Sequence, residues 1–154
     1  MKKLLALIVL LGAAGGAIYL AREGKLDLPA GLGGGDRSAL KRKSERFLEC
    51  LKFKNFAEAA SFHSAADLKA TPDIPKLLED FFLIPPESLD VQEYRIDYVE
   101  LDSTGRRAKV KTISTVRILN KNETRKPEIM LYWKREGGQW YMDLRTTLER
   151  KRGI

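Results

Sequence analysis

The sequence has very little sulfur or imidazole: one cysteine, Cys50, and one histidine, His63, in 154 residues. A single cysteine excludes an intrachain disulfide, and two such residues are too few for the Cys and His clusters that bind zinc. The sequence also lacks a glycine-rich phosphate loop and a nucleophile elbow. We therefore expect neither a bound metal nor a cofactor, and no catalytic residues.

Acidic residues are fewer than basic ones, 21 against 28, which leaves a net charge of +7. The hydrophobic fraction of 44% is ordinary for a globular protein, which excludes a disordered chain and a protein with many membrane spans. The length favours one domain.

Charge is missing altogether from residues 4–21. As a helix this run would extend about 27 Å, close to the thickness of a bilayer core. We expect residues 1–22 to be a transmembrane signal-anchor in the bacterial inner membrane, with the C-terminal domain in the periplasm. The small residues at 13–17 leave open the alternative of a cleaved signal peptide and a secreted domain.

A second segment, residues 23–36, has little to bury because it holds five glycines and Pro29. We interpret it as a flexible linker. The remaining residues, 37–154, form the expected domain, and its own net charge is positive.

The domain begins with three helical patterns. The first runs from Asp36 to about Lys52 and places Cys50 at the edge of its apolar face. The second starts at Asn55 and ends near His63, for which we expect a structural role at the helix end. The third follows residues 71–72 and stops at the prolines 85–86.

After residue 90 the period changes to two, which is typical of strands. We expect strands over residues 91–101, 107–119, 128–134 and 139–146, with a turn at 102–105 and a hairpin at Gly137 and Gly138. Helices followed by strands predict an α+β fold, in which the helices pack on one face of a four-stranded antiparallel sheet.

Two stretches resemble the nuclear transport factor 2-like (cystatin-like cone) superfamily. They are residues 44–64, with Phe47-Leu48 followed by Lys54-Asn55-Phe56-Ala57-Glu58-Ala59, and the hairpin 132–142. The resemblance implies a curved, cone-shaped sheet that can enclose a cavity. That superfamily contains isomerases, hydrolases, ligand binders and assembly modules, so it does not by itself assign a function. An N-terminal anchor before such a domain also resembles assembly components of bacterial secretion systems.

Alternation assigns the side chains of the strands to two faces. Polar groups on the inner face, which meets the helices, could hydrogen-bond a ligand in the cone: Tyr94, Tyr98, Thr112 and Ser114. The same groups could equally be core residues. Apart from Glu100 at the margin, the inner face holds no acid that could serve as the base of an isomerase.

The outer face is expected to be basic with interspersed apolar side chains. It is a candidate surface for a protein partner, for a second copy of the chain or for anionic lipid, and we expect no nucleic acid there. Its candidate residues are Lys109, Lys111, Arg117, Met130, Tyr132, Lys134, Tyr141 and Arg145. The sequence thus favours a non-catalytic, membrane-anchored accessory or assembly subunit of an envelope complex. The alternatives are a binder of a small apolar ligand or lipid, and an isomerase- or hydrolase-like enzyme.

Overall fold

A computed structural model of the chain describes residues 35–80, 82 and 84–152. The expected anchor, 1–22, and nearly all of the expected linker, 23–36, lie outside these residues, so both stay predictions. Within the described part of the chain, no helix combines the length and the apolar character that crossing a bilayer requires.

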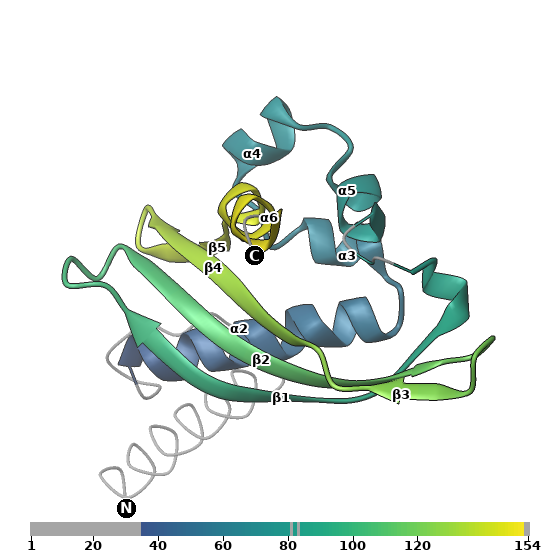
Figure 1. Cartoon of the computed structure of the whole chain (residues 1–154). Coiled ribbons are helices and arrows are strands. Elements are labelled where there is room, and N and C mark those ends of the chain that lie inside the picture. Colours follow the sequence, from purple (N-terminus) through teal and green to yellow (C-terminus); the bar gives the residue numbers. More distant parts are fainter. Residues whose placement is uncertain (1–34, 81, 83, 153–154) are drawn as a thin grey trace, which may run out of the picture. The chain divides into compact units, whose positions relative to one another are not determined.

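The first helix, α2 (Gly35–Lys52), covers the inner face of the sheet (Figure 1). Its apolar stripe is buried as the spacing predicted, and Cys50 is only 5% exposed within it. The second helix, α3 (Phe56–Ala60), begins after Asn55. The Asn55 side chain accepts a hydrogen bond from the Glu58 N–H and donates one to the Glu58 carboxylate, which is the expected capping pair.

Two more helices complete the N-terminal half: α4 (Ala65–Ala70) and α5 (Ile74–Asp80). The sequence did not predict α4, whose first turn is capped by the Ser64 hydroxyl accepting from the Asp67 N–H. Helix α5 was expected and buries Ile74 and Leu78, but it ends at Asp80, before the prolines 85–86 that were expected to stop it.

A short 3₁₀ helix, η1 (Pro86–Ser88), leads into an antiparallel sheet of β1 (Leu89–Leu101), β2 (Arg107–Ile118), β3 (Glu123–Arg125), β4 (Glu128–Glu136) and β5 (Gln139–Met142). The strand order is β1-β2-β4-β5, and the short β3 also pairs with β2. Figure 1 shows that the sheet curls around the helices. Because the helices pack against an antiparallel sheet, the expected α+β class is confirmed.

The core lies between α2, α3 and the middle of the sheet. Trp133 on β4 is 1% exposed, and the rings of Phe47 and Phe62 meet its indole edge-on at 6.5 Å between centroids. The backbone N–H of Met142 donates to the Phe62 carbonyl, which ties the segment after α3 to the edge of β5.

Strand β1 contains two β-bulges, between Val91 and Glu93 and between Ile96 and Tyr98. Each bulge adds a residue to one strand only and therefore inverts the alternation of side chains beyond it. Tyr94 and Ile96 face inward as expected, but Tyr98 lies on the outer face and is 39% exposed. The predicted inner position of Tyr98 was wrong for this reason, and Glu100 likewise lies outside, paired with Lys109.

The C-terminal end of the chain also departs from expectation. The last strand, predicted to reach residue 146, ends at Met142, and α6 (Leu144–Arg152) follows. Asp143 is the reason: its carboxylate accepts hydrogen bonds from the Thr146 N–H at 3.0 Å and from the Thr146 hydroxyl at 2.7 Å. This is the geometry of a helix N-cap, so Arg145 belongs to a helix and not to the outer face of a strand.

Candidate functional site

A cavity of about 430 Å³ lies where the inner face of the sheet meets the C-terminal end of α2. Its wall is formed by α2, the segment around Phe82 and Ile84, the start of β1, the second half of β2 and the junction between β3 and β4. Most of the lining is aliphatic or aromatic: Leu48, Leu51, Phe82, Ile84, Leu89, Val91, Val116, Ile118, Pro127 and Ile129.

Two residues that carry hydroxyl groups interrupt this apolar lining, Tyr94 and Ser114, and they are paired with each other across β1 and β2. Burial raises the pKa of Tyr94, and the carboxylates of Glu49 and Glu45 add to the effect. The phenol is therefore protonated at neutral pH, so its hydroxyl can act as a hydrogen-bond donor.

Three basic residues, Lys52, Arg125 and Lys126, complete the lining. Arg125 and Lys126 are exposed and Lys52 is half-buried, so the cations lie on the side of the cavity that faces solvent. Arg125 and Lys126 lie where β3 ends, before β4 begins at Glu128. Proline has no N–H to continue a ladder, and here the Ser114 N–H donates to the Pro127 carbonyl at 3.1 Å.

The four residues that the sequence predicted to contact a ligand therefore do not lie at one site. Tyr94 and Ser114 line the cavity, but Thr112 is fully buried and its hydroxyl donates to the Ile129 carbonyl at 3.1 Å. Tyr98 lies on the opposite face of the sheet. The sequence did not identify six residues of the lining: Lys52 at the end of α2, Phe82 and Ile84 after α5, Arg125 at the end of β3, and Lys126 and Pro127 between β3 and β4. All six lie at or beyond the end of an element, where the hydrophobic pattern does not show which segments meet in the fold.

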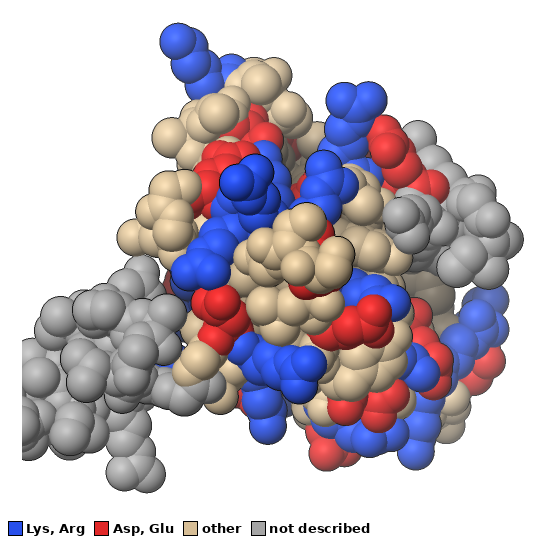
Figure 2. Space-filling model, turned by 90° about the vertical axis from the view of Figure 1, so that its left-hand side faces the viewer, with Lys and Arg blue, Asp and Glu red and all other residues tan. Residues whose placement is uncertain are grey.

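The outer face of the sheet, which the sequence predicted to be basic, carries ion pairs. Lys109 lies 3.0 Å from Glu100, Lys111 lies 2.9 Å from Glu128, and Lys134 lies 2.7 Å from Asp67. On the side of the molecule that Figure 2 shows, the left-hand side of Figure 1, acidic and basic side chains are also intermingled. Neutralised charges attract an anionic partner less than free ones do.

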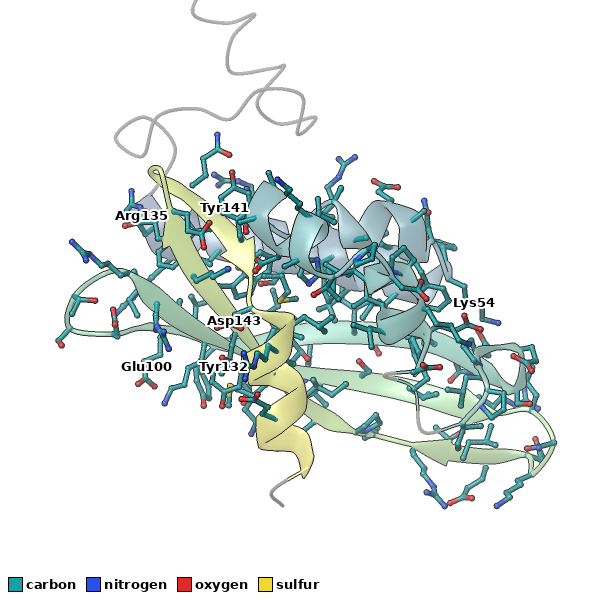
Figure 3. The ribbon with its side chains drawn as sticks, turned by 90° about the horizontal axis from the view of Figure 1, so that it is seen from above. Lys54, Glu100, Tyr132, Arg135, Tyr141 and Asp143 are labelled. Carbon is teal, nitrogen blue, oxygen red and sulfur yellow. The ribbon has the colours of Figure 1, made fainter. Side chains whose placement is uncertain are left out.

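The other residues predicted for this surface have local partners as well. The Arg117 guanidinium donates to the Asn122 side chain at 2.7 Å, and the Tyr141 hydroxyl donates to Gln139 at 3.2 Å. Met130 contacts the Tyr98 hydroxyl through its sulfur, at 4.0 Å. Tyr132 lies beside Asp143 where β5 passes into α6 (Figure 3), and the Tyr132 carbonyl accepts from the Asp143 N–H at 2.8 Å. Arg145 pairs with Glu149 along α6.

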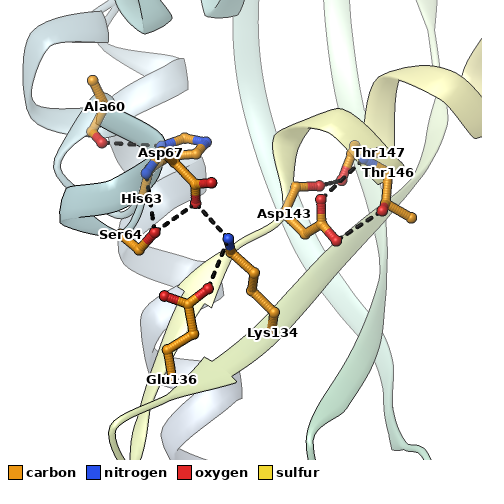
Figure 4. Close-up of polar contacts among 9 residues, drawn as sticks. All are labelled: Ala60, His63, Ser64, Asp67, Lys134, Glu136, Asp143, Thr146 and Thr147. Carbon is orange, nitrogen blue, oxygen red and sulfur yellow. Dashed lines mark hydrogen bonds and ion pairs between the residues drawn. The ribbon is translucent and has the colours of Figure 1, made fainter. Parts of the chain in front are cut away.

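A polar cluster joins α4 to β4 and lies near the start of α6 (Figure 4). The Lys134 ammonium contacts the carboxylates of Asp67 and Glu136, at 2.7 and 2.9 Å. His63, which is 3% exposed, places Nδ1 3.0 Å from the Ala60 carbonyl, and its Nε2 is buried without a hydrogen-bond partner among the described residues. Burial lowers the pKa of His63, so the ring is neutral at pH 7 and Nδ1 carries the proton that is donated.

Groups suited to metal binding or to general-base catalysis are scarce in the described part of the chain. No three His, Cys, Asp or Glu residues within it are placed to hold a metal ion. No carboxylate is found among the described residues that line the cavity. This lining thus offers no base of the kind that an isomerase needs, and the absence of enzymatic activity stays a prediction.

Comparison with known proteins yields little. No protein-family model and no curated protein matches the chain. Among solved structures, the intermembrane space region of the chloroplast protein ARC6 is similar at a TM-score of 0.31 and 14% identity, over 66% of this chain and 91% of that one. A similarity at this TM-score carries no functional argument.

Proposed function

We propose that the domain binds a small apolar ligand in the cavity between α2 and the sheet, as a carrier or sensor. The cavity itself, about 430 Å³ in volume and lined mainly by aliphatic side chains, is the observation that carries the proposal. Ligand sites in proteins are typically concave and mostly apolar, with a few polar groups that fix orientation. Tyr94 and Ser114 supply such groups here.

Filling this cavity is energetically favourable for an apolar molecule. Each methylene group moved from water into an apolar environment contributes about 0.8 kcal/mol. The cavity's volume of about 430 Å³ falls within the range of about 300–1,000 Å³ that is typical of small-molecule sites. The resemblance to the nuclear transport factor 2-like superfamily agrees with a cone that holds a ligand and remains a prediction.

In the proposed setting, residues 4–21 anchor the chain in the bacterial inner membrane and the domain lies in the periplasm. This setting would keep the cavity within the reach of a flexible linker from a membrane surface. The intact mass of the protein recovered from membranes would distinguish the anchored form from a secreted form that has lost its signal peptide.

Binding can be measured with the uncharged fluorophore N-phenyl-1-naphthylamine and the full chain, held in solution by a nonionic amphipol so that no free micelles compete. Ser114→Phe places a ring in the cavity, and its neighbour Thr115→Phe places one on the outer face of the same strand. We expect Ser114→Phe to weaken binding at least tenfold and Thr115→Phe to leave it unchanged.

A second filling variant, Val116→Phe, guards against a misfolded Ser114→Phe, and thermal unfolding verifies that each protein is folded. Equal binding by wild type, Ser114→Phe and Val116→Phe would refute the proposed function, as would no binding by the wild type.

A second candidate function, docking of a protein partner or a second copy of the chain, is favoured by one observation. Tyr98 is an exposed aromatic residue on the outer sheet face and contacts Met130, and both residue types are enriched at interfaces. Tyr98→Ala should then reduce the oligomer or complex seen by native mass spectrometry, with Thr115→Ala as the matched control. A strictly monomeric wild type that retains no partner in mild detergent would contradict this function.

A further inference from the structure

The cations at the cavity mouth differ in how their charges are compensated. Arg125 is held by the Glu123 carboxylate through two contacts, at 2.7 and 3.2 Å. The Lys52 ammonium instead donates to the backbone carbonyl of Gln92 at 2.9 Å and lies 5.9 Å from the centre of the Phe53 ring. No residue that the structure describes forms an ion pair with Lys52 or with Lys126.

This is the reverse of the outer sheet face, where Lys109, Lys111 and Lys134 each have at least one carboxylate partner. Two lysines that have no carboxylate partner among the described residues, Lys52 and Lys126, therefore belong to the lining of a cavity whose other residues are mostly apolar. A ligand that fits both features has an apolar body and a negative end.

We propose that the ligand is a single-chain anionic amphiphile, with its acyl chain among the aliphatic side chains of the cavity and its head group between Lys52 and Lys126. This inference rests on the proposed function and specifies its ligand. A carboxylate and a phosphate monoester share the required charge, so a fatty acid and a monoacyl phosphate are the two sources of such a head group. Tyr94 and Ser114 provide hydrogen bonds to any polar atom that enters further.

The head group and the acyl chain of the ligand are each expected to contribute to the binding affinity. A hydrogen bond to a charged group typically strengthens an interaction about tenfold relative to the same contact without charge. Each additional methylene that enters the cavity strengthens binding about fourfold, until the space is filled. The head group and the chain can therefore be varied separately.

The experiment measures displacement of N-phenyl-1-naphthylamine from the full chain in nonionic amphipol. Dodecanoate, dodecyl phosphate, dodecanol and dodecyltrimethylammonium share one chain and differ in the charge of the head group, while octanoate and decanoate vary the chain. The protein variants are Lys52→Gln and Lys126→Gln, with Lys121→Gln as the matched control. Lys121 is an exposed lysine between β2 and β3 that does not line the cavity.

We expect one or both anions to displace the probe at least tenfold more effectively than dodecanol, and the cation to be the weakest competitor. Stronger displacement by dodecanoate would identify a carboxylate as the source, and stronger displacement by dodecyl phosphate would identify a phosphate. Lys126→Gln and Lys52→Gln should each reduce the advantage of the anions severalfold, whereas Lys121→Gln should not.

The inference is overturned if dodecanol competes as well as the anions, or if Lys52→Gln and Lys126→Gln behave as Lys121→Gln does. In that case a cavity that still binds the probe and the alcohol leaves the proposed function standing. If neither the probe nor any of the chains binds, the proposed function fails and this inference fails with it.

Discussion

The ammonium of Lys134 on β4 lies 2.7 Å from the carboxylate of Asp67 on α4. The contact joins the outer face of the sheet to a helix that the hydrophobic pattern does not predict. Burial acts to raise the pKa of Asp67, but the hydrogen bonds from Lys134 and Ser64 outweigh it, so the net pKa is lowered. The carboxylate is therefore charged at neutral pH, and α4 is held by its charge as well as by its cap.

Replacing Lys134 with methionine should loosen α4. Both side chains are about one-quarter to one-third exposed, so we expect the free energy of unfolding to fall by about 1 kcal/mol. Chemical denaturation measures this change. A double-mutant cycle with Asp67→Asn measures the interaction between the two side chains. The two substitutions together should lower the free energy of unfolding by less than the sum of their separate effects. Lys109→Met, which removes an exposed pair, serves as the control and should have no measurable effect.

His63 makes the stability of the domain depend on pH. Burial lowers its pKa in the folded protein, and Lys134 acts in the same direction, although the hydrogen bond to the Ala60 carbonyl and the carboxylates of Asp67 and Asp143 act to raise it. The unfolded chain thus takes up a proton near pH 6.5, where the folded protein does not. The free energy of unfolding should therefore be highest above pH 6.5 and decrease as the pH falls below that value.

Urea titrations of the wild type between pH 7 and pH 5 would show this decrease. In His63→Gln the decrease over that window should be absent, because no group at this position can titrate. Asp67→Asn should retain the decrease, since the carboxylate at position 67 titrates only at lower pH. An unchanged slope in His63→Gln would exclude His63 as its source.

Cys50 should be almost inert in the folded protein. Burial raises the pKa of its thiol to about 11 from a reference value of 9.0, and the Glu58 carboxylate adds to the increase. At pH 8 the reactive thiolate is then about 100-fold scarcer than in the unfolded chain. Reaction with Ellman's reagent should accordingly be about 100-fold slower in buffer than in denaturant. Rapid labelling of the native protein would show that the helix face of α2 is open to solvent at this point.

The carboxylate of Asp143 should determine whether α6 forms. Asp143→Ala removes both hydrogen bonds to Thr146, and the loss of an N-cap typically costs about 1 kcal/mol. Hydrogen exchange should become faster in α6 and at the amide of Tyr132, which donates to the Thr147 hydroxyl. Asp143→Asn keeps an acceptor at the cap and should show little change. Equal exchange in Asp143→Ala and the wild type would mean that packing alone holds the helix.

Much of the fold could be predicted from the sequence because its strongest patterns are long. The stripe of α2, the alternation of β2 and β4, and the glycines of the last hairpin all fold as their spacing indicates. Helix α4 and strand β3 were missed because six and three residues are too short to show a period. The start of α6, residues 144–146, was mistaken for the end of a strand because Leu144 continues the alternation of β5, and only the cap at Asp143 ends the strand.

The candidate site was less predictable than the fold. Tyr94 and Ser114 could be identified because each lies in a regular stretch of a strand. Tyr98 was misplaced because a β-bulge depends on the pairing of two strands, which one strand's own sequence does not reveal. Lys52 and Lys126 gain their significance only from the cavity that they share, since as isolated residues they resemble any other surface lysine.

Because of its two bulges, β1 can lose one residue without changing the direction of its inward side chains, whereas β2 cannot. Gln92 and Asp97 are the residues of β1 that stand opposite no residue of β2. A chain shortened by one residue at Gln92 or at Asp97 would keep every inward side chain of β1 inside, because the deletion removes the bulge together with the extra residue. One residue lost from the middle of β2 would instead turn half of that strand's buried side chains toward water. Within the sheet, evolution can therefore change the length of β1 by one residue at these points while the hydrophobic face stays in register.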